Sequence, residues 1–551
     1  MPKERLTTTI GSLPPPEAEE GIAVTDRRAP VPPPLPADEV TRRFESLQSK
    51  LVPLWASIRA INRSEQTIVV VPSLSLEADM TAVQQQALEE RYLFLLLLLR
   101  QPRARLIYVT SQAIHREVVD YYLDLLPGVF SGHARKRLFL VSPLDGSRQT
   151  LTEKLLARPR LLEHIRSLVP DPDRAHLVPY NTTPLERELA VRLGIPMYGA
   201  DPRHFHLGTK SGARRIFAEE GVSHPLGVED LHSPAALAEA IGGMRRRKPS
   251  LTRVVVKLNE GVSGMGNAHV DLAGLPPAED PAAAAAVLER VQGMRFEAAA
   301  MTYGQFVSTL AEHGGIVEEL IAGREFRSPS AQLRVTPLGD VEALSTHDQM
   351  LGGPTGQTYL GCRFPASAEY SAAIMREALK VGRRLMREGV IGRFALDFVT
   401  VKNDRDEWEA YAIEINLRKG GTTHPFLTLQ FLTDGSYDPE AGVFLTPRGE
   451  RKAFVASDHV QSPKYRVFTH HDLFDLAAYH GLHFDHARHK GVVFHMLNGI
   501  AEEGSFGLTA VADSRDEAEA LYRRTIEVPD AEADAAAAAE GAAGGHERVG
   551  G

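Results

Sequence analysis

The sequence predicts a mixed α/β protein in which a domain with a parallel sheet precedes a domain built around an antiparallel hairpin. Short apolar runs near 67–74, 105–111, 137–143 and 175–181 are separated by helical segments rich in Leu, Glu and Arg. This repetition is typical of a parallel sheet covered by helices. Residues 392–421 alternate apolar and polar side chains on either side of a polar interruption, which indicates two antiparallel strands.

Composition narrows the class of protein. The chain has 551 residues, of which 43% are hydrophobic, so it can bury large cores in more than one domain. Its net charge of −9 argues against a general surface for nucleic acid or for an anionic membrane. The single cysteine, Cys362, excludes a disulfide framework and a cysteine-based zinc site, and it fits a reducing compartment.

The longest apolar run lies within residues 92–99 and is far shorter than the roughly 20 residues of a membrane span. We interpret its Leu95–Leu99 portion as a buried helix face rather than a surface for a partner. Residues 1–21 show no signal-peptide pattern. We therefore expect a soluble, cytoplasmic protein without nucleic-acid or membrane partners. The sequence leaves the oligomeric state open, and a homodimer is compatible with it.

Changes in composition divide the chain into five segments. Residues 1–38 are rich in proline and lack periodicity, which predicts a disordered, partly extended arm. The parallel sheet belongs to 39–200, the hairpin to 201–445, and an α+β segment to 446–528. Residues 529–551 are Ala, Gly and Glu with almost no large apolar side chain, which predicts a disordered tail. We expect helices at 84–101, 151–168, 471–480 and 515–525, and late strands at 464–469, 492–497 and 506–511.

Two carboxylates and an amide meet in the predicted hairpin. If the turn is centred near Arg405, Asp397 lies roughly opposite Glu414, with Cβ atoms about 5 Å apart, and Asn416 shares their face. Two acids at one place repel unless a positive charge separates them. An oxygen-only set of this kind suits Mg²⁺, or alternatively Mn²⁺. The competing interpretation is an ordinary solvent-facing strand surface.

Basic and small residues flank these acids. Arg393 and Arg418 fall on the same face, where planar guanidinium groups can hold a phosphoryl or carboxylate group. Directly after them, backbone N–H groups and hydroxyls could bind the reacting acid, although a simple strand-to-helix turn would look the same. The residues of this loop are Gly420, Gly421, Thr422, Thr423 and His424. Gln349 could cover the site from another side.

Two upstream lysines precede glycine-rich or helical segments. Lys210 opens a helix that Gly221 ends, and the pattern is not a Walker loop, so by itself it could be a surface lysine. Lys257 ends a β-branched strand, and a mobile loop follows in which backbone N–H groups can approach phosphate oxygens. A plain hairpin with a Gly-rich turn is the alternative. The loop residues are Gly261, Ser263, Gly264 and Gly266.

The order of these motifs resembles that of the ATP-grasp ligases. Lys210, then Lys257 with its loop, E-E-x-x-x-G-x-E at 318–325, Asp397-Phe398 and E-x-N-x-R at 414–418 follow one another. Longer strings resemble the peptide-ligase subgroup related to pheganomycin biosynthesis and cover roughly residues 65–525. They are PSLSLEADM at 72–80, LTEKLLARPRLL at 151–162, GTKSGARRIF at 208–217, EINLRKGGTTHP at 414–425 and GVVFHMLNG at 491–499.

The resemblance implies an ATP-grasp fold, preceded by a Rossmann-like pre-ATP-grasp domain and followed by a small α+β C-terminal domain. It also implies that both lysines and the glycine loop hold phosphates. In this family Asp397, Glu414 and Asn416 would bind Mg²⁺. The adenine contacts would come from Glu318 and from the backbone of Glu319, Leu320 and Ile321, and the ribose contact from Glu325.

The implied function is an ATP- and Mg²⁺-dependent carboxylate–amine ligase that forms an acylphosphate and releases ADP. Arg418, with Arg393, would stabilise that intermediate. The partners would be small-molecule or peptide acids and amines. A kinase-like phosphotransferase and a nucleotide-binding regulatory protein are the alternatives. A zinc site at His480, His483, His486 and His489 is less favoured than pH-dependent or substrate contacts, because no cysteine accompanies them.

Overall fold

The computed structural model describes residues 35–61, 65–76, 80–260, 266–298, 301–352 and 358–546. The predicted N-terminal arm lies outside the described residues as far as residue 34. The prediction is wrong for the last two residues of the arm, 37 and 38, because they are the start of helix α1 (Ala37–Gln48). This helix buries Val40 and Phe44. Within the described part of the chain, no helix has the length and apolar character needed to cross a membrane.

The predicted parallel sheet is confirmed. Its strands run in the order β3-β2-β1-β4, and all neighbours are parallel. Alternate residues of β1 face opposite sides: Val69 and Val71 pack against one helical layer, whereas Ile68 and Val70 belong to the main core. The strands are β1 (Gln66–Val71), β2 (Ala104–Val109), β3 (Leu138–Val141) and β4 (Ala175–Pro179).

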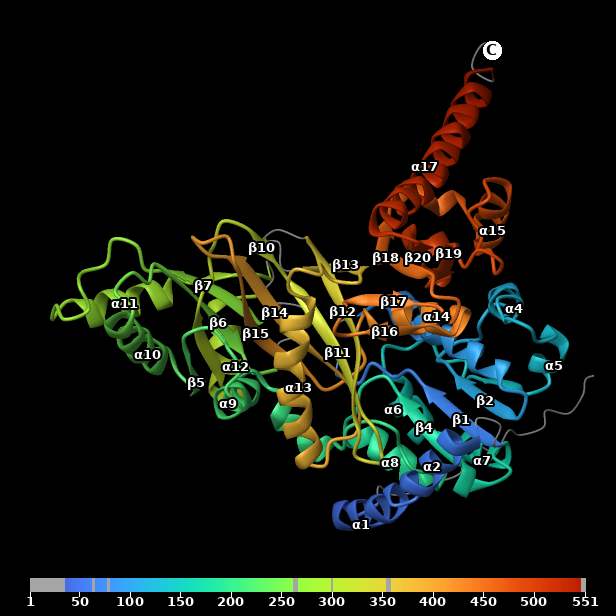
Figure 1. Ribbon diagram of the computed structural model, residues 1–551, viewed down its shortest axis with the longest axis horizontal. Coiled ribbons are helices and arrows are strands. Elements are labelled where there is room, and N and C mark those ends of the chain that lie inside the picture. The colour runs from blue at the N-terminus through green and yellow to red at the C-terminus, as the bar shows by residue number, and fades with distance from the viewer. Residues whose placement is uncertain are drawn as a thin grey trace, which may run out of the picture. The chain divides into compact units, whose positions relative to one another are not determined.

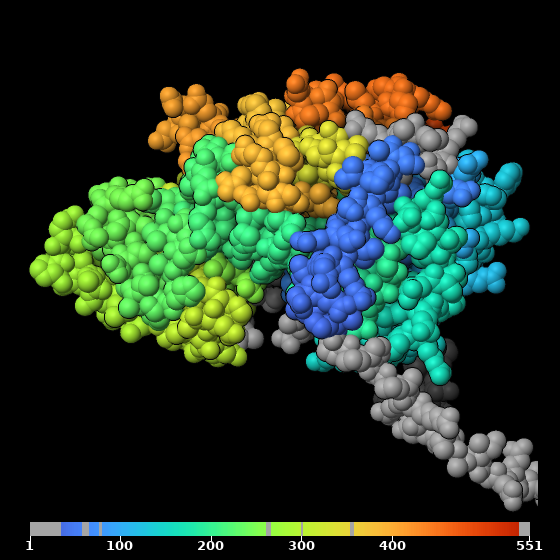
Figure 2. All heavy atoms as spheres, turned by 90° about the horizontal axis from the view of Figure 1, so that it is seen from below, coloured from blue at the N-terminus to red at the C-terminus, as the bar shows by residue number. Residues whose placement is uncertain are grey.

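Helices cover this sheet on both faces, and α1 packs against α8 (Figures 1 and 2, blue beside teal). The predicted helix at 151–168 is two helices, α6 and α7, because Pro159 starts a new one. The helices of this part are α2 (Leu51–Ile61), α3 (Ala82–Glu90), α4 (Arg116–Asp124), α5 (Ser131–Arg135), α6 (Leu151–Leu156), α7 (Pro159–Ser167) and α8 (Pro184–Leu193), with 3₁₀ helices η2 (Pro172–Arg174) and η3 (Pro202–Gly208).

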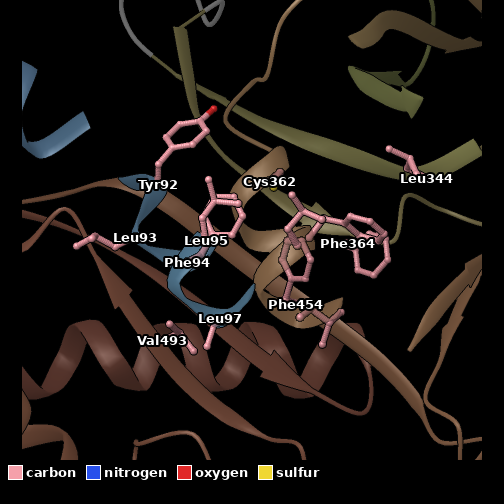
Figure 3. Packing of buried hydrophobic residues seen from close by; sticks show 14 of the residues in the cluster. Tyr92, Leu93, Phe94, Leu95, Leu97, Leu344, Cys362, Phe364, Phe454 and Val493 are labelled. Carbon is pink, nitrogen blue, oxygen red and sulfur yellow. The ribbon is translucent and has the colours of Figure 1, made fainter. Parts of the chain in front are cut away.

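The apolar run after α3 forms a separate 3₁₀ helix, η1 (Arg91–Arg100). All of its leucines except Leu98 are buried. Figure 3 shows Phe94, Leu95 and Leu97 near Phe364, Phe454 and Val493, which come from three later strands. Burial on this scale confirms the interpretation of a core segment. Arg91, the first residue of η1, is buried as well and directly precedes Tyr92 of the main core.

A five-stranded antiparallel sheet follows, in the order β5-β9-β6-β7-β8 (Figure 1, green). Helix α9 (Lys210–Glu219) leads into it, begins at Lys210 as predicted, and is capped by the side chain of Thr209. The remaining elements are β5 (Gly227–Leu231), α10 (Pro234–Arg247), β6 (Arg253–Leu258), β7 (Asn267–Asp271), α11 (Ala283–Gln292), β8 (Arg295–Phe296), α12 (Tyr303–His313) and β9 (Gly315–Glu319).

The largest sheet has eleven strands and contains the predicted hairpin as β14 (Gly392–Lys402) and β15 (Trp408–Asn416). Helix α13 (Ser371–Arg387) packs its buried face on β11 and β12. The other strands up to residue 445 are β10 (Phe326–Arg327), β11 (Pro329–Val335), β12 (Val341–Gly352), β13 (Thr358–Phe364), β16 (Ser436–Asp438) and β17 (Val443–Leu445), with α14 (Thr423–Thr433) between β15 and β16.

The C-terminal segment continues this sheet, since β18 pairs with β13 as well as with β20. The strand predicted at 464–469 is wrong: Pro463 starts the 3₁₀ helix η4 (Pro463–Val467). The other elements are β18 (Arg451–Gln461), α15 (His470–Tyr479), β19 (Gly491–His495), η5 (Leu497–Gly499), α16 (Ile500–Glu503), β20 (Ser505–Ala512) and α17 (Arg515–His546).

The predicted disordered tail is also wrong as far as residue 546. Helix α17 continues through it, because alanine has the highest helix propensity and the helix finds partners. Tyr465 donates a hydrogen bond to Asp530 at 2.7 Å, and Lys464 pairs with Asp534 at 3.1 Å. Ala533 is buried in the main core.

Candidate active site

A cavity of about 1020 Å³ is lined by residues of both antiparallel sheets. The five-stranded sheet contributes Lys257 and Glu318, and α9 contributes Lys210. The hairpin contributes Asp397, Glu414 and Asn416, which the sequence placed together. Motifs that are spread over some two hundred residues of sequence therefore meet around one space.

The predicted register of the hairpin is confirmed. Asp397 pairs with Glu414, and Ala395 pairs with Asn416. A bulge follows Asp397, because the next residue, Phe398, pairs with Ala412. The extra residue, Ile413, also lines the cavity, although strict alternation had put it on the opposite, apolar face.

Each of the two carboxylates has its own polar partners. Asp397 accepts hydrogen bonds from Asn416 Nδ2 at 3.0 Å and from Gln349 Nε2 at 2.9 Å. Lys210 Nζ donates to Glu414 Oε1 at 2.5 Å. The hydrogen bond from Gln349 is consistent with the predicted cover of the site.

Burial and the charge of Glu414 raise the pKa of Asp397 to about 7. Burial acts in the same sense on Glu414, but the ammonium of Lys210 outweighs it and lowers the pKa of that carboxyl. Asp397 and Glu414 lie opposite each other across the hairpin, and the charge of Glu414 makes Asp397 a weaker acid, so a cation is favoured between them. The donors fit Mg²⁺ if the Asn416 amide turns its oxygen toward the ion.

Lys257 is paired with Glu318, which also accepts from Arg214 Nη1 at 3.2 Å. The backbone N–H groups of Glu319 and Leu320 donate to Leu226 at 2.8 Å and to Arg253 at 3.2 Å. Glu319, Leu320 and Ile321 are the three backbone positions predicted to contact adenine. Among the described residues, the N–H of Ile321 has no protein acceptor. Leu320 and Ile321 line the cavity, as predicted for that edge.

Two other nucleotide predictions have different outcomes. Glu325 is not among the residues that line the cavity; its carboxylate pairs with Lys402 at 3.2 Å and Arg327 at 3.4 Å. Gly266 is described, and its carbonyl accepts from the N–H of Leu258 at 2.9 Å. Gly261, Ser263 and Gly264 lie outside the described residues.

The two arginines are in different places. Arg418 lines the cavity, and its Nη1 donates to the carbonyl of Lys419 at 3.4 Å. Arg393 is not in the lining; it is paired in register with Arg334. It shares a strand face with Asp397 but lies four residues away, about 13 Å along the strand. Burial and the charge of Arg334 lower the pKa of Arg393 to about 10.

The loop after the hairpin is also divided. Gly420, Gly421 and Thr422 line the cavity, whereas Thr423 and His424 are buried inside helix α14 and are outside the lining. A Cβ atom at Gly421 would lie 2.5 Å from the ring of Tyr359, so only glycine allows this approach. The predicted acid-binding loop is therefore reduced to its first three residues.

Comparison with known proteins matches two parts of the chain to family models. Residues 203–292 and 278–440 match the family model described as IQCH-like, ATP-grasp, and residues 472–525 match the PGM1 C-terminal domain. Over residues 203–440 the chain is thus similar to the ATP-grasp family. The matched residues include the five-stranded sheet and the hairpin that together line the cavity.

Two curated relatives are similar over most of this chain. L-propargylglycine–L-glutamate ligase of Streptantibioticus cattleyicolor is 28% identical over 475 residues, which are 85% of this chain and 92% of that protein. IQ motif-containing protein H of Danio rerio is 23% identical over 536 residues, which are 88% of this chain and 50% of that protein.

Solved structures are similar at lower identity. Biotin carboxylase of Campylobacter jejuni, solved as a β,γ-ATP complex, has a TM-score of 0.48 and 12% identity, and covers 85% of this chain and 92% of that one. N5-carboxyaminoimidazole ribonucleotide synthetase of Thermus thermophilus has a TM-score of 0.45 and 13% identity, with coverage of 84% and 98%.

Sequence reasoning missed one wall of the cavity. Arg91, Tyr180, Tyr359, Asp458 and Met496 line it, and they come from η1, the end of β4, β13, β18 and the end of β19. No short spacing connects these residues, so a local motif could not reveal them. Met496 alone falls within a string, 491–499, that carried the subgroup resemblance.

Asp458 is the centre of a buried polar cluster on this wall. Its Oδ1 is 2.8 Å from His495 Nε2 and 3.2 Å from His424 Nε2, and its Oδ2 accepts from Arg91 Nη1 at 2.7 Å. These contacts hold the pKa of Asp458 well below its usual range against the effect of burial. Among the described residues, two groups could hold a metal ion: His424 with Asp458 and His495, and His115 with Glu117 and His470. Neither includes His480, His483, His486 or His489, for which pH-dependent or substrate contacts stay a prediction.

Proposed function

We propose that the protein is an ATP-dependent carboxylate–amine ligase that activates an acid as an acylphosphate, releases ADP and joins the acid to an amino acid or peptide amine. The observation that carries this proposal is the opposed pair Asp397 and Glu414, with Lys210 against it and Arg418 lining the same cavity. The name of the Streptantibioticus relative, a ligase, supports the same reaction class.

The residues around the cavity suit phosphoryl transfer to a carboxylate. Asp397, Glu414 and Asn416 would hold Mg²⁺, or Mn²⁺, and the ion would offset charge on the phosphate oxygens. Lys210 and Lys257 now pair with Glu414 and Glu318, and each ammonium can exchange its carboxylate for a phosphate oxygen. Glu318 would then be free to meet the nucleotide, with Arg214 still holding its other oxygen at 3.2 Å.

The proposed reaction has two steps. An oxygen of the acid attacks the γ-phosphorus of ATP, the bond to the β-phosphate oxygen breaks, and ADP leaves. The amine nitrogen then attacks the acyl carbon, inorganic phosphate leaves, and the nitrogen gives up a proton. Arg418 faces the space where charge grows in both steps and would stabilise the acylphosphate and the tetrahedral species.

The size of the cavity agrees with more than one occupant. Sites for single small ligands are about 300–1,000 Å³, and this cavity of about 1020 Å³ is just above that range. One side is formed by the nucleotide motifs, and the other by Gly420, Gly421, Tyr180 and Asp458. We assign the acid to the Gly420–Gly421 side, close to Arg418.

The test is a product assay. Purified protein, ATP and Mg²⁺ are incubated with pairs of amino acids, and ADP, phosphate and new masses are measured together. The proposal predicts ADP and phosphate in equal amounts with one new amide mass. A stable phosphorylated acid without an amide would instead indicate a kinase-like enzyme, and nucleotide binding without ADP release would indicate a regulatory protein.

A further inference from the structure

Arg91 is a buried cation whose hydrogen-bonding capacity is mostly unused. Its side chain is 7% exposed and lines the cavity, and its guanidinium carbon lies 5.4 Å from the centre of the Tyr180 ring. A guanidinium has five N–H donors. Within the described part of the chain, the Arg91 guanidinium donates one hydrogen bond, from Nη1 to Asp458, and its Nε is buried without an acceptor.

The unused donors form one edge of the guanidinium. Asp458 takes the bond at Nη1, which leaves Nε and Nη2 side by side. This edge matches the two oxygens of a carboxylate in a bidentate pair. A desolvated charged donor without an acceptor is unfavourable in free energy. A ligand that supplies two oxygens removes this unfavourable contribution.

Surrounding contacts prevent Arg91 from turning away. Asp458, only 5% exposed, is itself held by His495 and His424 on its other oxygen. Burial lowers the pKa of His424 to about 4, so that ring is neutral at physiological pH. The segment that follows Arg91 is anchored in the main core, where Figure 3 shows Leu93, Leu95 and Leu97 packed among later strands.

The charges on this wall favour a zwitterion over a simple anion. Arg91 and Asp458 cancel as a pair, and a ligand with both a carboxylate and an ammonium leaves the balance unchanged. The neighbouring Glu90 does not disturb it, because burial raises the pKa of that carboxyl to about 8 and keeps it protonated at neutral pH. Amino acids and peptides have this pair of charges.

We propose that the Nε–Nη2 edge of Arg91 binds the carboxylate that does not react, so that the amine substrate is an amino acid or peptide with a free carboxylate. Asp458, which is held by His424 and His495, is a positioning residue for Arg91. This inference rests on the proposed ligase function, but it concerns a different wall of the cavity from the phosphate and metal residues.

The test compares each amino acid with its own carboxamide as the amine substrate, at fixed acid and saturating ATP. The wild-type protein should use the free carboxylate at least ~10²-fold better in kcat/KM, because the amide cannot satisfy a site built for an anion. In Arg91→Lys the charge remains but the fork is lost, so the KM of the amino acid should rise and the preference should shrink. The affinity for ATP should stay as in wild type.

The matched control is Arg100→Lys. Arg100 ends the same 3₁₀ helix, donates to the carbonyl of Phe431 at 2.7 Å and is not in the lining of the cavity. It should keep the preference of the wild type. A second variant, Arg91→Met with Asp458→Asn, removes both charges together and avoids a lone buried carboxylate.

Binding of the same amino acids and carboxamides is also measured by calorimetry, without turnover. Equal use and equal binding of both forms by the wild type would overturn the Arg91 subsite even if amides are made. Carboxylate-dependent binding that Arg91→Lys abolishes, in a protein that makes no amide, would instead overturn the ligase function and leave the subsite in place.

Discussion

At the scale of single residues, Asp397 and Glu414 show how a pair of identical chemical groups acquires different properties. Asp397 is held by two neutral amides, and its pKa rises to about 7 through burial and the opposing Glu414. Glu414 is held by an ammonium at 2.5 Å, which lowers its pKa although burial acts against this. A cation placed between the two carboxylates would relieve the repulsion that raises the pKa of Asp397.

Replacing Glu414 with Gln should therefore abolish turnover without unfolding the protein. The change keeps the size of the side chain but removes one charge from the proposed ion site, where several kcal/mol of charge stabilisation are at stake. We expect ADP formation at saturating Mg²⁺ to fall by at least ~10²-fold. Glu409→Gln is the control, since Glu409 is on the same strand but bonds to Tyr411 and Asn403 near the turn. Unchanged ADP formation in Glu414→Gln would remove this residue from the ion site.

Arg418 gives a second prediction at this scale. Arg418→Lys keeps the charge and loses the planar fork, and a single preorganised donor to a growing charge is typically worth about 10²- to 10³-fold in rate. Amide formation should drop by that amount, while the affinity for a non-hydrolysable ATP analogue, measured by calorimetry, should hold. A variant that binds the analogue weakly but turns over bound ATP normally would place Arg418 with the nucleotide instead.

At the scale of elements, the local sequence pattern predicted those features that depend on residues close together in sequence. Alternation and a turn-rich interruption were enough to place Asp397 opposite Glu414, and a capping threonine before Lys210 marks where α9 begins. The bulge that turns Ile413 to the cavity breaks alternation and has no local signature. The prediction put Arg393 in the site because it shares a strand face with Asp397. A shared face does not indicate how far along the strand the cavity extends, and Arg393 lies outside its lining.

The loop after the hairpin allows a prediction from adjacent glycines. A Cβ at Gly421 would meet the Tyr359 ring at 2.5 Å, whereas a Cβ at Gly420 has no heavy atom of the described chain within 4 Å. Gly421→Ala should therefore push Tyr359 aside and lower kcat/KM for the acid, by up to ~10²-fold if the reacting group moves by about 1 Å. Gly420→Ala leaves Tyr359 in place and should therefore lower kcat/KM for the acid less than Gly421→Ala does in the same kinetic assay. Equal effects of the two changes would show that Tyr359 does not set the shape of this loop.

At the scale of the whole molecule, the cavity depends on contacts between segments far apart in sequence. Arg91 from the N-terminal part reaches Asp458 of β18, and Lys419 reaches the carbonyl of Pro179 at the end of β4. Such long-range pairs leave no spacing to detect, which is why the wall with Arg91 and Asp458 could not be predicted. The helical tail was missed for a related reason: its partners, Lys464 and Tyr465, lie some seventy residues earlier.

Lys419 makes one of these connections and should make stability depend on pH. Burial, with the nearby charge of Arg393, lowers the pKa of Lys419 from 10.5 to about 7. Between these values the unfolded chain binds a proton at this position that the folded chain does not, so the free energy of unfolding should rise with pH from about 7 to about 10. Below about pH 7 both states are protonated and the contribution no longer changes.

Lys419→Met removes this group, so the difference between wild type and variant isolates its effect from all other titrations. The urea midpoint of the wild type, relative to that of Lys419→Met, should increase steadily between pH 7 and pH 9.5. Lys402→Met is the control, because Lys402 lies at the far end of the hairpin, where Glu325 raises its pKa instead of burial lowering it. The urea midpoint of the wild type, relative to that of Lys402→Met, should not show the upward trend. If the wild type and Lys419→Met keep a constant difference over this range, Lys419 is protonated in the folded protein, and its bond to Pro179 is that of an ordinary ammonium.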